Sequence, residues 1–177
     1  MNTRLLQLTI IMLVITLLSG CTEPDPIQNG QFVYPAKSRI AKNQRSAGNQ
    51  IPPMPAFDGV YPDRWPTEFK FPSETYAYYS LKLEPVSSPA ASQMIRFRCV
   101  SKGSPNEILD YFRQEFQAAG MSLSHDNASG PIMGSPGVHD LSVENFSGAG
   151  VTYALLKVTM DDDLGGYTQY GGHFQFR

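Results

Sequence analysis

The sequence predicts an α+β fold of two layers, with one amphipathic helix packed on a mostly antiparallel sheet. Segments of alternating apolar and polar residues indicate strands, one segment with apolar residues at helical spacing indicates a helix, and turn residues separate them closely. The expected order is β-β-α-β-β-β-β. The chain of 177 residues, 41% of them hydrophobic and 17% charged, has the length and composition of one globular domain with appendages.

Two strands come first, at residues 75–83 and 94–101. Alternation puts polar and aromatic side chains on one face of both strands and apolar side chains on the other. Residues 85–89, which begin and end with proline, are expected to form a turn or loop between them. The polar and aromatic face carries Tyr76, Tyr78, Arg96 and Arg98.

The helix has the clearest local signal in the chain. Ser104, Pro105 and Glu107 form a capping box with proline at the first helical position, where its missing N–H costs nothing. Gly120 follows the last apolar position and is expected to end the helix. The spacing predicts a helix over residues 105–119 that docks on the sheet through Ile108, Leu109, Phe112, Phe116 and Ala119.

Four strands are expected after the helix. A polar loop rich in glycine and proline, residues 125–138, separates the first from the second, and the second and third form a β-hairpin. An acidic turn at residues 161–166 leads to the last strand, which Gly171 and Gly172 are expected to interrupt. The strands are predicted at residues 121–124, 140–146, 151–160 and 167–177.

The N-terminus has the pattern of a secretory signal peptide over residues 1–20. Arg4 supplies the positive charge, and the apolar run of residues 5–18 is too short for a transmembrane helix. The run ends in Leu18-Ser19-Gly20-Cys21, which resembles the lipobox of bacterial lipoproteins. The alternative is an ordinary signal peptide with a cysteine after its small residues.

The resemblance implies that Cys21 becomes the acylated N-terminus of a lipoprotein, with a diacylglyceryl group and a palmitate-type chain. Two or more acyl chains anchor a protein stably to a membrane. Thr22 stands where the family carries aspartate for inner-membrane retention, so the resemblance implies the outer membrane and a domain in the periplasm. Residues 93–160 further resemble small uncharacterised α+β domains of bacterial envelope lipoproteins, a likeness of architecture that carries no catalytic residue.

The rest of the chain divides into a tether, residues 21–72, and a domain, residues 73–177. Nine prolines and no periodic apolar pattern between residues 22 and 72 predict a disordered tether, whose cations at residues 37–45 are either solvated or in contact with an acidic surface. Within it, the aromatic segment (residues 57–71) holds five aromatic residues among prolines. We expect it to pack along the domain, the alternative being a peptide offered to a partner's groove.

Candidate chemistry is sparse. The histidines His125, His139 and His173, two of them followed by aspartate, are the candidates for a metal-binding protein or a hydrolase facing the periplasm, but their spacing matches no known ligand pattern. Cys99 lies in a strand pattern and is expected to be a small buried residue. The acidic turn lacks the ligand spacing of a calcium loop. The sequence therefore predicts no catalytic residue, no metal and no cofactor.

The leading hypothesis is a non-enzymatic envelope lipoprotein that binds a protein or polymer through the sheet face turned away from the helix. Tyrosine and arginine are enriched at interaction hot spots. Residues 73–177 carry seven basic and eleven acidic side chains, a balance of −4 that argues against a nucleic-acid partner. The alternative for this face is an ordinary solvent-facing surface. The candidate interaction residues are Arg96, Arg98, Tyr76, Tyr78, Tyr153 and Lys157.

Overall fold

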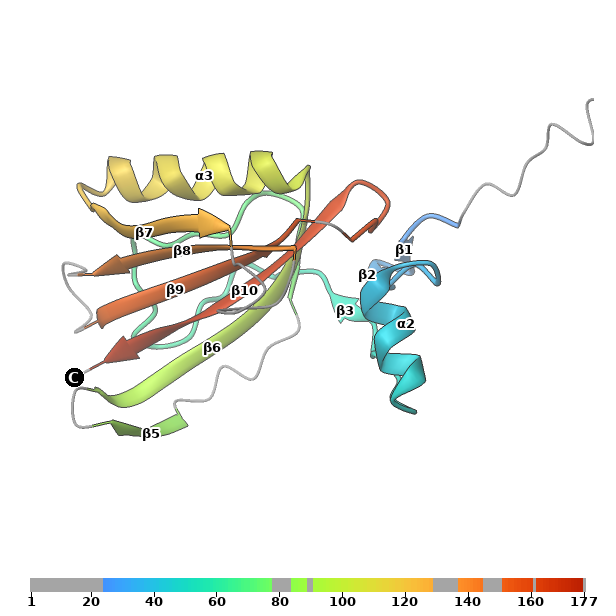
Figure 1. The fold of residues 1–177 in the computed structure, drawn as a ribbon, viewed down its shortest axis with the longest axis horizontal. Coiled ribbons are helices and arrows are strands. Elements are labelled where there is room, and N and C mark those ends of the chain that lie inside the picture. Colours follow the sequence, from blue (N-terminus) through green and yellow to red (C-terminus); the bar gives the residue numbers. More distant parts are fainter. Residues whose placement is uncertain are drawn as a thin grey trace, which may run out of the picture.

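The structure, a computed structural model, describes residues 24–77, 84–88, 91–128, 137–144, 151–160 and 162–176. The expected signal peptide, Cys21 and Tyr78 lie outside these residues. The α+β class with a helix layer on an antiparallel sheet is confirmed (Figure 1).

The main sheet has seven strands, of which six follow the order β4-β6-β10-β9-β8-β7, while β5 pairs with β6. All pairings are antiparallel, and β10 pairs with β6 along its entire length. The strands are β4 (Thr75–Ala77), β5 (Glu84–Ser88), β6 (Ala91–Lys102), β7 (Leu123–Ala128), β8 (Val138–Glu144), β9 (Val151–Thr159) and β10 (Tyr167–Phe176).

Helix α3 (Pro105–Ala118) forms as its capping box predicts. The Ser104 hydroxyl accepts a hydrogen bond from the Glu107 N–H at 3.3 Å, and the Glu107 carboxylate accepts one from the Ser104 N–H at 2.6 Å. Gly120, with φ of 72°, follows the C-cap. The buried face that docks on the sheet consists of Ile108, Leu109, Phe112 and Phe116.

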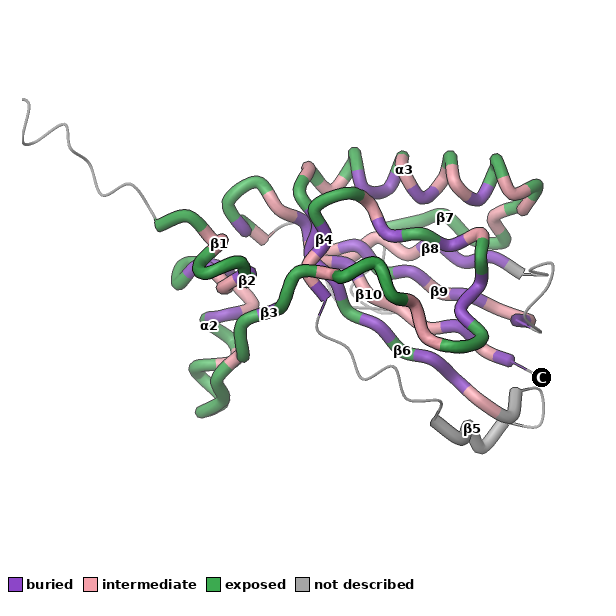
Figure 2. The backbone as a smooth tube through the Cα atoms, turned by 180° about the vertical axis from the view of Figure 1, so that it is seen from behind, coloured by how far each residue is buried: buried purple, intermediate pink, exposed green. Residues whose placement is uncertain are grey.

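The aromatic segment covers the part of the same sheet face that α3 leaves open, which confirms the packing expectation (Figure 2). Trp65, Phe69 and Phe71 are buried in the main core. The Phe69 ring stacks on Phe112 of α3 at 4.9 Å, and the Trp65 indole N–H donates to the Phe69 carbonyl at 2.6 Å. Prolines prevent a regular helix or strand here, and the segment instead contains two turns, closed by hydrogen bonds from the Trp65 and Phe69 N–H groups to the Pro62 and Pro66 carbonyls.

Three predictions about the strands are wrong in detail. Residues 85–89 are predicted to form a turn or loop, yet residues 84–88 form β5, because an extended chain can pair with the edge of β6 despite Pro85. His125 and Asp126 lie in β7 and not in a loop, since they pair with β8. Strand β10 continues through Gly171 and Gly172, which pair with strands on both sides.

The N-terminal segment, residues 24–55, is not the disordered tether that its composition predicts. It forms a second helix and a small sheet of order β1-β2-β3. Phe32 and Met54 are buried there against Val100 and Leu164 of the main domain, so the segment gains its apolar contacts from residues far along the chain. Its elements are β1 (Ile27–Gln28), β2 (Gln31–Phe32), α2 (Arg39–Ser46) and β3 (Met54–Pro55).

The acidic turn holds the start of α2 to the domain. The Asp162 carboxylate accepts hydrogen bonds from the backbone N–H groups of Arg39 at 2.6 Å and Ile40 at 3.0 Å. Asp163 forms an ion pair with Lys37 at 2.8 Å. A carboxylate at the first turn of a helix pairs favourably with the unsatisfied N–H groups there. The turn thus binds a helix N-terminus.

Candidate binding site on the open face of the sheet

The sheet has one face covered by α3 and the aromatic segment, and an opposite face that we call the open face. On β10, Tyr170 and Phe174 point into the main core, so the alternating residues Gln169, Gly171 and His173 belong to the open face. Figure 1 looks onto this face, and Figure 2 shows the covered face with the aromatic segment in front.

The N-terminal segment covers one end of the open face. Phe32 is fully buried there, with its ring 5.4 Å from that of Tyr167 and 6.2 Å from that of Tyr76. Val100 of β6 completes the contact. The Tyr34 hydroxyl donates a hydrogen bond to the Gln169 carboxamide oxygen, at the border between the covered and uncovered parts. This end therefore holds a second, smaller core.

The other end of the open face forms a hollow of about 380 Å³. Gly171 lies at its centre and pairs with Arg98 of β6 on one side and with Lys157 of β9 on the other. Because Gly171 has no side chain, the space above it is open, and the two residues that flank this space, Arg98 and Lys157, are cationic. The hollow is lined by Arg96, Phe97, Arg98, Val138, Leu155, Lys157, Thr159, Gln169, Tyr170, Gly171, Gly172 and His173.

Close backbone approach requires the glycines beneath the hollow. A Cβ atom on Gly172 would lie 1.9 Å from the Leu155 carbonyl oxygen, and one on Gly171 would lie 2.7 Å from the Phe97 carbonyl oxygen. Side-chain carbon atoms do not reach such distances without movement of the backbone. The hollow is therefore a consequence of how the three central strands pack.

Positive charge dominates the hollow. Arg96, Arg98 and Lys157 line it, and Asp140 beside it pairs with Lys157 at 3.4 Å. Burial, together with Arg96 and Lys157, lowers the pKa of His173, which favours the neutral imidazole at neutral pH. The arrangement can hold an anion by charge and by hydrogen bonds.

Five of the six interaction residues that the sequence predicts lie in the described part of the chain, and Tyr78 does not. Arg96, Arg98 and Lys157 line the hollow, and the Tyr153 ring lies 5.9 Å from that of His173 beside it. Tyr76 is covered by the N-terminal segment instead of exposed, because that segment folds. The sequence analysis did not predict that Gly171 would lie beneath a hollow. The signal for it in the sequence is the pair of adjacent glycines, Gly171 and Gly172, within an apolar strand pattern.

The three histidines do not form a common site. His125 and His173 lie in the same cross-strand row on the open face, but three strand spacings separate their backbones by about 14 Å. His139 pairs with Val158 on the opposite face. Among the residues that the structure describes, no group of three or more histidine, cysteine or acidic side chains could hold a metal ion.

One of the histidines belongs to an ion-pair cluster below α3. Arg113 donates to both oxygens of Asp126, at 2.8 and 2.9 Å, and His139 Nε2 lies 2.6 Å from the same carboxylate. The Arg113 hydrogen bonds lower the pKa of Asp126 to about 2. Because Asp126 is ionised down to strongly acidic pH, the cluster ties α3 to β7 and β8.

Cys99 is buried, as the sequence predicts. Burial raises the pKa of its thiol well above the usual range, which suppresses the nucleophilic thiolate. Nearby in the core, the Tyr170 hydroxyl lies 2.8 Å from the Ser101 hydroxyl, which lies 2.5 Å from that of Thr75. These hydroxyl groups satisfy one another inside the core.

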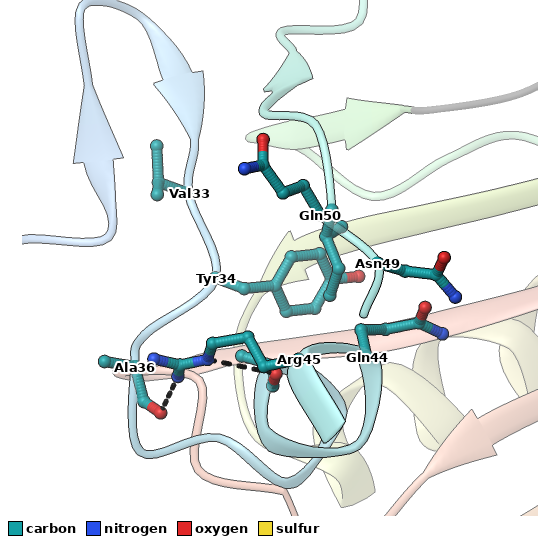
Figure 3. A pocket seen from close by; sticks show the side chains of 9 residues that line it. Val33, Tyr34, Ala36, Gln44, Arg45, Asn49 and Gln50 are labelled. Carbon is teal, nitrogen blue, oxygen red and sulfur yellow. Dashed lines mark hydrogen bonds between the residues drawn. The ribbon is translucent and has the colours of Figure 1, made fainter. Parts of the chain in front are cut away.

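A second hollow, of about 280 Å³, lies within the N-terminal segment (Figure 3). Its cation, Arg45, donates hydrogen bonds to the carbonyl groups of Ala36 and Ala41. Its aromatic ring, Tyr34, is bonded through its hydroxyl group to Gln169. Because Arg45 and Tyr34 already make these hydrogen bonds, we favour the first hollow, the one above Gly171, as the binding site.

None of the helices in the described part of the chain is both long enough and apolar enough to cross a membrane. Comparison of the chain with protein-family models, with curated proteins and with solved structures gave no match.

Proposed function

We propose that this chain is a non-enzymatic protein of the bacterial cell envelope that binds an acidic partner through the open face of its sheet. The observation that carries the proposal is the hollow over Gly171, which three cationic side chains line. The partner is acidic because the cations lie on both sides of the hollow, on β6 and β9. Such placement favours docking of negative groups.

The lipid anchor on Cys21 is part of the proposal. Its support is the lipobox-like sequence at residues 18–21, and its chemistry would place the protein at a membrane, with the outer membrane favoured by Thr22. The first strand, β1, begins at Ile27, and the chain from Cys21 to that strand can span at most about 22 Å. A lipidated protein of this kind would hold its domain close to the membrane surface.

Metabolic labelling with a palmitate analogue tests the anchor. We expect the full chain to incorporate the label and the Cys21→Ala variant to incorporate none, whereas Cys99→Ala should be labelled like the unaltered chain. Equal labelling of the Cys21→Ala variant would contradict lipidation at this residue.

Site-specific photo-crosslinking in cells tests the docking face. A crosslinking amino acid at Thr159, in the hollow, should trap a partner that one at Gln117, on the exposed face of α3, does not trap. Replacement of both Arg96 and Arg98 by glutamate should abolish this adduct. The matched control is Lys102→Glu, which reverses an exposed charge on β6 outside the hollow and should leave the adduct intact. An adduct that survives the double replacement would contradict the proposed face.

A further inference from the structure

The chemistry of the hollow narrows the acidic partner to one kind of group, and this step rests on the proposed function. Besides its cations, the hollow is lined by two neutral side chains that carry hydrogen-bond donors, Gln169 and His173. The Gln169 carboxamide oxygen accepts a hydrogen bond from the Tyr34 hydroxyl. The other group of the carboxamide, its NH₂, is a hydrogen-bond donor. His173 Nε2 lies 3.2 Å from the Gln175 amide nitrogen, which can only donate, and this contact favours the neutral tautomer with its proton on Nδ1.

The cations lie close enough to act on one group. Arg98 and Lys157 are two strands apart, with about 9.5 Å between their backbones, and long side chains from both sides can reach the space over Gly171. Arg96 lies two residues from Arg98 on the same face of β6, about 7 Å along the strand. A guanidinium presents paired N–H donors that match the oxygens of a phosphate or carboxylate.

The amount of charge favours phosphate over a single carboxylate. Three cations line the hollow, and Lys157 also pairs with the Asp140 carboxylate. A phosphate monoester carries a charge of about −1.5 to −2 at neutral pH and three acceptor oxygens. Its charge and its three oxygens suit a site with cations on both sides, whereas a carboxylate offers one charge and two oxygens.

The size of the hollow indicates that the phosphate belongs to a larger molecule. A volume of about 380 Å³ is within the range of small-ligand sites, and Leu155 and Val138 supply apolar surface beside the charged part. We therefore infer that the hollow over Gly171 is a binding site for the phosphate group of an organic phosphate ester, held by Arg98 and Lys157 with Arg96 at the rim.

Titration with inorganic phosphate and with glycerol phosphate tests this site directly. The full chain, isotope-labelled and kept in an uncharged detergent, is titrated at pH 7.5 and constant ionic strength, with sodium chloride as the reference salt. We expect saturable shifts of the Gly171 and Gly172 amide resonances with both phosphates and none with chloride, and tighter binding of the ester.

Four variants separate a site from general attraction. Arg98→Gln should weaken phosphate binding about tenfold, and Lys157→Gln about threefold because that lysine is shared with Asp140. Asp140→Asn should strengthen binding about threefold by removing the competing carboxylate. The control Lys102→Gln, on the same strand but outside the hollow, should bind as the unaltered chain does.

Three results would overturn the phosphate site: shifts that do not saturate, equal weakening by Arg98→Gln and Lys102→Gln, or tighter binding of succinate than of glycerol phosphate. If the titration contradicts phosphate binding while the crosslink at Thr159 is lost on reversal of the arginine charges, the docking proposal is supported and only the phosphate ligand is rejected. If phosphate binds as expected and no partner is trapped, the phosphate site stands and the docking proposal falls.

Discussion

The two ends of the open face are built on the same strands, but one end is covered by the N-terminal segment and the other forms the hollow. At one end, β6 and β10 present Val100 and Tyr167, which the N-terminal segment covers with Phe32. At the other end, the same two strands present Arg96, Arg98 and His173, which line a hollow. The side chains differ, while the backbone ladder is continuous between the two ends.

The difference shows how the chain uses its own N-terminal segment. Burial of apolar surface contributes roughly 25 cal/mol per Å² to stability, so packing of the N-terminal segment on the apolar end of the sheet is favourable. A cationic end would lose hydration under the same cover without gaining a partner. The boundary falls at the Tyr34–Gln169 hydrogen bond, where the covered end stops and the hollow begins.

Phe32→Ala should have the largest effect, because it removes the ring that the covered end buries completely. We expect a loss of about 3 kcal/mol in the free energy that holds the N-terminal segment in place. Hydrogen exchange of the α2 amides would measure this loss. The exposed neighbour Gln31 supplies the control, since Gln31→Ala should leave exchange unchanged; equal exchange in both variants would show that the segment does not depend on this contact.

Gly172→Ala tests whether the backbone packing beneath the hollow is as tight as its geometry indicates. Its new methyl group would meet the Leu155 carbonyl oxygen, so we expect a cost of about 2 kcal/mol in urea unfolding. Gly171→Ala should cost less, because its closest contact is longer. A tolerated alanine at Gly172 would contradict the close approach of β9 and β10.

Asp162→Ala should loosen the N-terminal segment less than Phe32→Ala does. It removes a carboxylate that accepts from two backbone N–H groups of α2, which stabilises a helix start by about 1 kcal/mol. The adjacent Asp163→Ala removes an exposed ion pair with Lys37 and a hydrogen bond from the Gly165 N–H, neither of which involves an α2 backbone group, so it should loosen α2 less. Hydrogen exchange of α2 would distinguish them, and equal effects would count against the capping role.

Arg98→Gln should have the smallest effect on stability, within about 0.5 kcal/mol in urea unfolding, because the side chain is exposed. The same variant is expected to weaken phosphate binding strongly. This pairing of a neutral effect on folding with a large effect on binding would distinguish the uncovered end from the covered one. A large loss of stability would instead mean that Arg98 serves the fold.

The local elements of the domain could be predicted from the sequence where short-range chemistry determines them. The capping box at Ser104 and Glu107 and the glycine after α3 are satisfied within the helix itself, so their signal is complete in the sequence. The number of aromatic rings in the aromatic segment predicts that it is buried, but not which residues it contacts. Strand β5 could not, because its pairing depends on the edge of β6.

The candidate site could be predicted only in part. Alternation placed Arg96, Arg98 and Lys157 on one face, and the sheet brings them together around the hollow. The same reasoning included Tyr76, whose exposure depends on whether a distant segment folds over it. The role of Gly171 could not be predicted, since it arises from strand order: β10 lies between β6 and β9, its partners from two distant parts of the chain.

The sequence by itself determined the α+β class, the limits and cap of α3, and the alternation that separates the two faces of the sheet, because these depend on residues near one another in the chain. The tertiary structure alone decided that residues 24–55 fold, that Asp162 binds the first N–H groups of α2, and that cations on β6 and β9 flank Gly171. Each of these depends on contacts between residues far apart in sequence, whose energy exists only once the sheet has assembled.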